Sequence, residues 1–379
     1  MGGLDNSLLG IAVAGWVLVA SGCGSAAGPG VGSPGSGGSS GAVDSAAEAA
    51  GSGGAAGVTT NDDAADRPST GGSSGGAAGN TNDGGDASGI GGAAGNVAAD
   101  AGRDAVAARP LCPPGPFEMP RVGASRTVCA GVARYNWSEG PAWVATQGAF
   151  YFTNFPNMIF DTGDIIKYTP GTGVCEIFIE GARCNGLAPT TDGNIVGACQ
   201  GTRAIMKYDL ATKQATTVAS MVQGTIFGQP NDLIQHSNGS IYFSSPAVRP
   251  GRPAGFESAT LRIDPMGAVT VVGLGASNGI ALSPDERRLY VVGQGVWDLD
   301  IQGVPSNKRA FNLGGDGIAV DCAGNVYDNG GNISNPAGQR IGTLPASTNM
   351  SFGGADGKML LLVANQSARV IDMNLPGLP

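Results

Sequence analysis

The chain has 379 residues, with 66 glycines, only 13% charged residues and a formal net charge of −9. Residues 24–110 hold nine acidic and three basic side chains, so they account for −6; Asp5 adds −1, which leaves −2 for residues 111–379. This nearly neutral remainder excludes nucleic acid as a partner, because phosphate binding requires a basic surface.

Residues 1–23 are typical of an export signal. The apolar run at 8–20 is too short for a comfortable transmembrane helix, and small residues precede Cys23 in a pattern that resembles a bacterial lipobox. The first seven residues depart from that pattern, since they contain Asp5 and no basic residue. We therefore expect an exported protein, either a lipoprotein of the bacterial cell envelope or a periplasmic or secreted protein whose signal is cut without lipidation. Any membrane contact would be through the lipid anchor.

Residues 24–110 consist largely of Gly, Ala, Ser and Asp and contain no aromatic residue. Such a segment cannot bury enough apolar area to offset its ordering entropy, which predicts a disordered tether. Low-complexity sequence without a selected role is an equal alternative. The folded domain is expected to span 111–379.

A short pattern recurs six times in this folded part, and it is clearest at 277–292. A polar residue, usually followed by Gly, leads into an apolar run, a turn and a strand-like run. The leading residues, separated by 33 to 47 positions, are Glu139, Asn185, Asn231, Asn278, Asp316 and Asn349. A period of roughly 40–50 residues with several short strands is typical of a β-propeller of four-stranded blades. The sequence thus predicts an all-β, six-bladed β-propeller, which we expect to be monomeric.

If each copy occupies the same place in its blade, the six leading residues form one ring around the central channel. Carboxylate and amide oxygens facing one cavity would suit a hard cation. The alternative is that Asn, Asp and Gly serve only as turn and strand-start residues. The presence of Glu139 and Asp316, where Asn would serve a turn equally well, favours the site.

Three further segments have expected roles. The Pro/Gly-rich loop at 246–258, with two arginines, is expected over the channel mouth, or else is a solvated crossover. Residues 368–373 resemble a last strand that closes the ring. His236 stands beside a turn at 237–239, so it is expected to be exposed rather than the base of a Ser-His-Asp triad, which needs a buried, oriented imidazole.

Six cysteines fall within the folded part. An even number in an exported domain permits disulfides, although six cysteines allow 15 connectivities. Proximity in sequence favours Cys112–Cys129, with Cys184 paired to Cys175 or Cys199. A zinc site is not expected, because no CxxC pair occurs and His236 is the only histidine.

Five motifs, in this order and spacing, resemble the gluconolactonase, senescence marker protein and luciferin-regenerating enzyme superfamily. They lie at 138–143 (SEGPAW), 229–243 (QPNDL and GSIYF), 277–286 (SNGIALSPDE), 315–321 (GDGIAVD) and 348–354 (TNMSFGG). The resemblance covers essentially all of residues 130–379. It implies a six-bladed propeller with one divalent cation in its channel and, commonly, hydrolysis of sugar-acid lactones.

The resemblance also implies roles for individual residues. Glu139, Asn278 and Asp316 match the metal ligands, and Asp316 also matches the catalytic residue, expected to act as general base on the attacking water. Asn231 and Asn185 match substrate-contacting positions. The cation is expected to be Ca²⁺, with Zn²⁺, Mg²⁺ or Mn²⁺ as alternatives, and the partner a small-molecule lactone or ester.

One departure from the family pattern bears on specificity. Gluconolactonases usually read Thr-Asp-Pro after the third copy's strand, whereas this chain has Ser244, Ser245 and Pro246. Substrate identity therefore stays open. A rival reading is a non-enzymatic propeller that binds a ligand or another protein and keeps the metal as a structural clip, since fold alone does not establish chemistry.

Overall fold

The computed structural model describes residues 112–132, 134–157 and 161–379. The predicted export signal at 1–23 and tether at 24–110 lie outside the described residues. Within the described part, no helix has both the length and the apolar character needed to cross a membrane.

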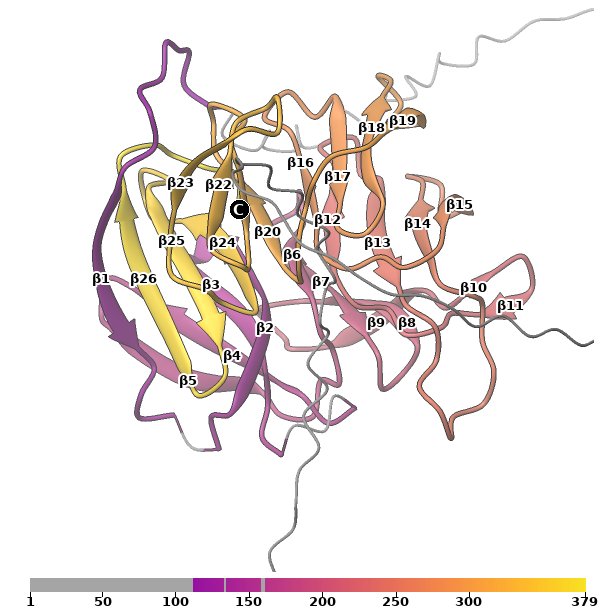
Figure 1. Ribbon diagram of the computed structural model, residues 1–379. Coiled ribbons are helices and arrows are strands. Elements are labelled where there is room, and N and C mark those ends of the chain that lie inside the picture. The colour runs from indigo at the N-terminus through magenta and orange to yellow at the C-terminus, as the bar shows by residue number, and fades with distance from the viewer. Residues whose placement is uncertain (1–111, 133, 158–160) are drawn as a thin grey trace, which may run out of the picture. The chain divides into compact units, whose positions relative to one another are not determined.

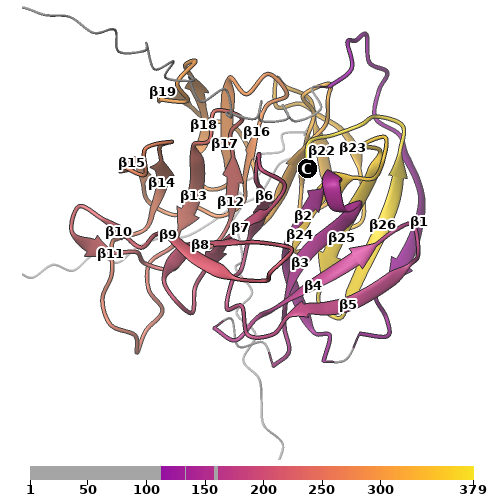
Figure 2. The same ribbon diagram turned by 180° about the vertical axis from the view of Figure 1, so that it is seen from behind.

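The described residues form six four-stranded antiparallel sheets arranged around a centre, which confirms the predicted six-bladed propeller (Figure 1, Figure 2). Blade 1 comprises β2 (Trp137–Val144), β3 (Ala149–Phe155), β4 (Asp164–Thr169) and β5 (Val174–Ile179). Blade 2 comprises β6 (Leu187–Pro189), β7 (Ile195–Cys199), β8 (Ala204–Tyr208) and β9 (Ala215–Ala219). Blade 3 comprises β12 (Leu233–Gln235), β13 (Ile241–Ser245), β14 (Ala259–Ile263) and β15 (Val269–Leu274).

The remaining three blades complete the ring. Blade 4 comprises β16 (Ile280–Leu282), β17 (Arg288–Val291), β18 (Gly295–Leu299) and β19 (Pro305–Arg309). Blade 5 comprises β20 (Ile318–Val320), β21 (Val326–Asp328), β22 (Asn332–Ser334) and β23 (Arg340–Thr343). Blade 6 comprises β24 (Asn349–Gly353), β25 (Met359–Ala364), β26 (Ser367–Met373) and β1 (Val122–Val128). Outside the blades lie the hairpin of β10 (Met221–Val222) and β11 (Thr225–Ile226) and one 3-10 turn, η1 (Ala145–Gln147).

The apolar core lies between neighbouring blades. Tyr151 and Phe178 of blade 1 pack edge to face, with ring centroids 5.2 Å apart, in one cluster with Leu187 of blade 2. At the closing seam, Phe152 of blade 1 packs in one cluster with Leu361 of blade 6. Because each fully buried aromatic or aliphatic side chain contributes about 1.5–3 kcal/mol, every blade is stabilised chiefly by its neighbours.

The ring is closed by strands from both ends of the domain. The expected strand at 368–373 is present as β26, but it is the third strand of blade 6 rather than the outermost one. The outermost strand is β1, which precedes the first repeat and pairs antiparallel with β26. The sequence pattern missed β1 because most of its side chains are exposed on both faces, so it lacks an apolar alternation.

Three disulfides link the six cysteines, and only one of the two expected pairings is present. Cys184 pairs with Cys199, one of its two predicted partners, but the expected Cys112–Cys129 bond is wrong. Cys112 instead pairs with Cys322, 210 residues away. Cys129 pairs with Cys175. Distance along the chain misleads here, because ring closure brings the segment around β1 beside blades that are remote in sequence.

Candidate functional site

The inner edges of blades 2, 3 and 4 share one backbone irregularity, and it contains the predicted ring residues. The N–H of Asn278 donates to the carbonyl of Val292 at 3.2 Å, while the Val292 N–H donates to the carbonyl of Gly279 at 2.9 Å. Two residues thus oppose one, which is a β-bulge. The same pattern places Asn185 with Gly186, and Asn231 with Asp232, at the corresponding points. Bulges redirect side chains, and these three lie at the same place in successive blades.

The sixth copy has a different register from the predicted one. The N–H of Thr348 donates to the carbonyl of Val363 at 2.8 Å, as the leading residues of blades 2, 3 and 4 do with their neighbouring strands. Thr348 is therefore the structural equivalent of Asn278, and Asn349 stands one residue later, at the place of Gly279. The sequence pattern shifted the copy by one residue because Asn349 resembles the other leading amides.

Glu139 and Asp316, from blades 1 and 5, lie close enough to influence each other's charge. Glu139 is 3% exposed, and burial raises the pKa of its carboxyl well above the usual range, with the negative charge of Asp316 as the next contribution. The indole of Trp137 opposes the shift by donating from Nε1 to Glu139 Oε1 at 2.8 Å. Burial also raises the pKa of Asp316 to about 6, partly offset by a hydrogen bond with Asn278.

Several oxygens of this group have no hydrogen-bond partner. Glu139 Oε2, Asn185 Oδ1 and Asn278 Oδ1 are all buried and unpaired in the described structure. A buried polar atom left unsatisfied costs about 1–3 kcal/mol. Three such acceptors at the ring positions, with two carboxylates among the ring residues, match the oxygen ligands preferred by hard divalent cations. The residues present therefore fit a cation.

No group of three or more His, Cys, Asp or Glu arranged for a metal occurs among the described residues. The predicted ligand set contains only two residues of those types, Glu139 and Asp316, and its third member is the amide of Asn278.

Asp232 is a third carboxylate near this group that the sequence pattern did not single out. It is 6% exposed and receives a hydrogen bond from Asn349 Nδ2 at 3.1 Å. Burial raises its pKa to about 7, although the hydrogen bond from Asn349 opposes the shift. The sequence did carry a signal, since the third copy has Asp where copies 1, 2, 4 and 5 have Gly. Asn329 was also missed: its Oδ1 accepts the Asp316 N–H at 2.7 Å and fixes that backbone.

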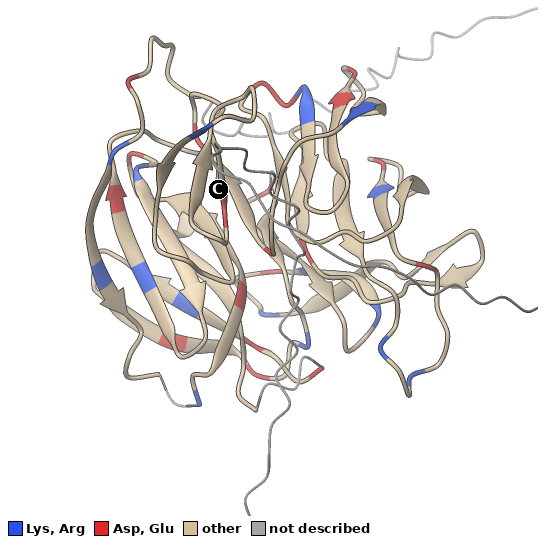
Figure 3. Cartoon of the chain, viewed as in Figure 1, with Lys and Arg blue, Asp and Glu red and all other residues tan. Residues whose placement is uncertain are grey.

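The loop at 246–258 lies against the bulge end of blades 2 and 3. The backbone N–H of Arg249 donates to Gln229 Oε1 at 3.2 Å, two residues before Asn231. Arg252 forms an ion pair with Asp161, and buried Arg203 donates to the carbonyls of Phe227, Gly228, Pro253 and Ala254. The loop is therefore held to blades 2 and 3, which carry Asn185 and Asn231, and through Asp161 to the segment between β3 and β4 of blade 1. Figure 3 shows Lys and Arg scattered over the blades rather than gathered into one patch.

His236 is not the exposed residue that the sequence predicted. It is 6% exposed, its Nδ1 accepts the Asn238 N–H at 3.0 Å, and it lies 3.5 Å from Glu286 Oε2 of the next blade. The imidazole is buried although Ser237 of the turn is exposed, and Glu286 also accepts the Ser237 N–H at 2.9 Å. His236 thus belongs to a contact between blades 3 and 4.

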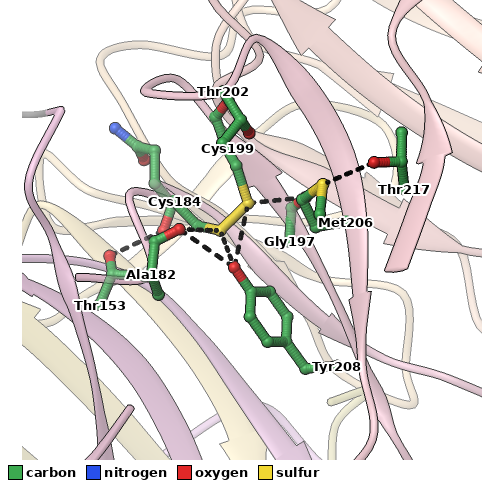
Figure 4. The surroundings of a disulfide bond; sticks show 10 residues. Thr153, Ala182, Cys184, Gly197, Cys199, Thr202, Met206, Tyr208 and Thr217 are labelled. Atoms are coloured by element: carbon green, nitrogen blue, oxygen red, sulfur yellow. Dashed lines mark hydrogen bonds between the residues drawn. A yellow bond between two sulfur atoms is a disulfide. The ribbon is translucent and has the colours of Figure 1, made fainter. Parts of the chain in front are cut away.

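Figure 4 shows the disulfide between Cys184 and Cys199, and Cys184 directly precedes the ring residue Asn185 in the chain. Both cysteines are fully buried, and the Tyr208 hydroxyl lies 3.1 Å from the Cys184 sulfur and donates to the Ala182 carbonyl at 3.0 Å. On the other side, Thr153 Oγ1 of blade 1 donates to the Asn185 carbonyl at 2.7 Å. The backbone of Asn185 is therefore fixed on both sides.

These features define a six-bladed β-propeller whose inner edge carries buried carboxylate and amide oxygens at equivalent positions. Residues 137–366 match the model of the SMP-30/Gluconolactonase/LRE-like region, and the chain belongs to this family. It is 29% identical over 289 residues to a gluconolactonase of Zymomonas mobilis, covering 62% of this chain and 78% of that protein. The resemblance inferred from the motifs is thereby confirmed.

Solved structures show the same fold. A gluconolactonase from Xanthomonas campestris superposes with a TM-score of 0.58 at 24% identity, covering 71% of this chain and 99% of that one. A calcium-binding regucalcin from Agrobacterium tumefaciens superposes with a TM-score of 0.54 at 18% identity, covering 67% of this chain and 95% of that one.

Proposed function

We propose that this protein is a divalent-cation-dependent hydrolase that opens a lactone. The observation that carries the proposal is the set of three buried, unpaired oxygens on the ring residues Glu139, Asn185 and Asn278. Of these residues, Glu139 interacts with the charge of Asp316 and Asn278 forms a hydrogen bond with the Asp316 carboxylate. The relationship to a gluconolactonase supports lactones as the substrate class. Among divalent cations we choose Ca²⁺, because it prefers an all-oxygen ligand set and because the regucalcin of the same fold is a calcium-binding protein.

Glu139, Asn278 and Asp316 would hold the cation, which when bound would polarise the lactone carbonyl and stabilise the developing oxyanion. Asp316 accepts a proton from the attacking water as that water adds to the carbonyl carbon. The ring C–O bond then breaks, the leaving alkoxide takes up the proton that Asp316 accepted from the water, and the product is a hydroxy acid. Asn231 and Asn185 orient the substrate oxygens, since an amide can both donate to and accept from hydroxyl groups.

The full chain would be tested by pH-stat hydrolysis of a lactone panel, with Ca²⁺, with EDTA and as the Asp316→Asn variant. We expect Ca²⁺-dependent turnover that falls at least 100-fold in Asp316→Asn, because that change removes both a ligand and the base. Wild-type rates in Asp316→Asn would refute the assigned role.

The same assay, combined with melting temperatures measured with and without Ca²⁺, addresses the binding-propeller alternative. If no lactone is hydrolysed while Ca²⁺ still raises the melting temperature, the cation is a structural clip and the enzyme proposal fails. Export and lipidation are a separate proposal, based on the sequence of residues 1–23, and would be tested by mass spectrometry of the mature N-terminus for a lipidated Cys23.

A further inference from the structure

Asp232 and Asn349 interrupt the glycine pattern of the inner edge in the third and sixth blades. The residue after the leading position is glycine in copies 1, 2, 4 and 5, but it is Asp232 in copy 3 and, in the corrected register, Asn349 in copy 6. Blades 3 and 6 are diametrically opposed in a six-bladed ring. The bond from Asn349 Nδ2 to Asp232 Oδ2, at 3.1 Å, therefore spans the central channel.

Both side chains are fixed by a second hydrogen bond on their own strand. Asp232 Oδ1 accepts the Leu233 N–H at 2.9 Å, and Asn349 Oδ1 accepts the Met350 N–H at 2.8 Å. The two residues are 6% and 4% exposed. Neither side chain can rotate without leaving a buried backbone N–H unpaired, which costs about 1–3 kcal/mol.

Each member of the pair also packs directly on the blade that precedes its own in the chain. A Cβ placed on Gly186 of blade 2 would come within 2.6 Å of Asp232 Oδ1. A Cβ on Gly317 of blade 5 would overlap the Asn349 side chain. Gly186 follows Asn185 and Gly317 follows Asp316, so the pair touches the backbone beside both ring residues. Glycine is needed at these two places because of this close approach.

A small cavity of about 40 Å³ lies in the central channel next to the pair. It is lined by inner strands of all six blades and by Leu378 and Pro379, and we call the part of the channel that holds it the lower channel. Asp232 and Asn349 line this cavity, whereas Glu139, Asn185, Asn231, Asn278 and Asp316 do not. The pair therefore lies between the predicted ring and the lower channel. The lower channel is itself crossed by the last described residues, where the Leu378 N–H donates to the Val320 carbonyl at 2.9 Å.

We propose that the Asp232–Asn349 bond is the floor of the cation site, and that both are positioning residues that set the distance between Asn231 and Asp316 across the channel. The inference rests on the cation site proposed above. Neither residue is assigned as a ligand. Asp232 acts through Asn231 beside it, and Asn349 acts through its contact with Gly317, beside Asp316, and through a side-chain hydrogen bond with Glu139. Breaking the bond should loosen the ring oxygens and weaken cation binding even where the charge of the site is unchanged.

The test is a double-mutant cycle on Ca²⁺ affinity, measured by titration calorimetry on the full chain. Asp232→Ala and Asn349→Ala should each weaken Ca²⁺ binding about tenfold, and the double variant should be no weaker than either single. The coupling expected from that tenfold factor is about 1.4 kcal/mol. For any lactone that the protein hydrolyses, variants that bind Ca²⁺ more weakly should have a lower kcat, and their KM should change less than their kcat. Asp298→Asn is the matched control and should match wild type, because Asp298 contacts only Arg309 and Asn307, both on the outer strand of its own blade 4, through the interactions described for its side chain.

A swapped pair separates position from charge and provides conservative variants should the alanine variants fail to fold. Asn349→Asp places two carboxylates face to face and should weaken Ca²⁺ binding. D232N/N349D restores a donor, an acceptor and both backbone hydrogen bonds, so it should recover to within about threefold of wild type.

Two results would overturn the inference: Ca²⁺ binding by Asn349→Ala as tight as wild type, or a swapped protein no better than Asn349→Asp. Wild-type protein that binds no divalent cation would instead refute the proposed cation site, so the two failures are distinguishable.

Discussion

The Glu139 carboxylate is expected to destabilise the cation-free protein and to favour cation binding. Its Oε2 is buried and unpaired, and burial together with the charge of Asp316 raises the pKa of its carboxyl. A carboxyl whose pKa is raised by folding destabilises the cation-free chain progressively as the pH rises from its unfolded-state pKa to its folded-state pKa. The same negative charge would attract and bind the cation.

Glu139→Gln should therefore stabilise the cation-free protein while removing cation binding. Gln retains an oxygen that can accept the Trp137 indole N–H but has no charge to bury. We expect the free energy of unfolding in EDTA at pH 8 to rise by about 1 kcal/mol, with Ca²⁺ affinity at least tenfold weaker. Urea unfolding and calorimetry measure the two quantities; a less stable variant with unchanged affinity would contradict the assigned role.

Gly279 of blade 4 lies in close contact with the backbone of Asp316 in blade 5. Its N–H donates to the Asp316 carbonyl at 3.0 Å, and a Cβ placed on it would overlap that carbonyl oxygen. Gly279→Ala should cost about 1–3 kcal/mol by urea unfolding, because overpacking against backbone cannot be relieved by side-chain rotation. Gly171→Ala is the control, since a Cβ there meets nothing within 4 Å and its φ is not positive. Equal effects of the two substitutions would refute the close contact.

At the scale of single elements, the Cys184–Cys199 bond and the Cys129–Cys175 bond provide a matched comparison. The first lies beside Asn185 at the inner edge, whereas the second joins the segment after β1 to β5, in the cluster between blades 6 and 1. Loop-closure entropy over 15 and 46 residues sets upper bounds of about 3 and about 4 kcal/mol for their contributions to stability.

Removing the inner bond should affect substrate binding as well as stability. We expect C184S/C199S to raise KM several-fold for any lactone that the protein hydrolyses. Without the disulfide, the backbone of Asn185 would keep the hydrogen bond from Thr153 to its carbonyl but lose the covalent link at the preceding residue. C129S/C175S should lower the melting temperature and leave KM unchanged. Steady-state kinetics well below both melting temperatures make the comparison, and unchanged KM in both variants would show that the inner disulfide is only a structural link.

The elements that repeat were predictable, and those that occur once were not. The six copies predicted six blades because each repeats a polar residue, a glycine and an apolar run at a nearly constant spacing. β1 has no counterpart among the copies and is mostly exposed, so no pattern indicated it. The pairing of Cys112 with Cys322 depends on ring closure, which brings together residues that no local signal connects.

Within the candidate site, residue types were predictable but registers were not. Asn185, Asn231 and Asn278 stand at equivalent bulges of blades 2, 3 and 4, yet Asn349 stands one residue further along than its resemblance to them suggested. The bulges explain the error, because an extra residue in the inner strand changes which side chain faces the channel without changing the local sequence pattern. Asp232 was missed for a different reason: its hydrogen-bond partner across the channel, Asn349, lies 117 residues away in the sequence.

For the whole molecule, the buried carboxylates predict how stability changes with pH. Asp316 and Asp232 have pKa values raised to about 6 and about 7, and the pKa of Glu139 is raised as well. Between about pH 4 and pH 7 the folded protein therefore binds more protons than the unfolded chain, whose carboxyls titrate near 4. Because stability falls with pH wherever the folded state holds more protons, the cation-free protein should lose stability as pH rises through this window.

A bound cation should reverse this trend, since it stabilises the ionised carboxylates that the empty site disfavours. In EDTA, we expect the melting temperature to fall between pH 5 and pH 8; in millimolar Ca²⁺, it should fall less or rise. The gain from Ca²⁺ should be largest at pH 8 and nearly absent at pH 5, because protons compete with the cation for the same oxygens. Scanning calorimetry of wild type and E139Q across this range tests both parts. A Ca²⁺ effect independent of pH would place the ion away from these carboxylates.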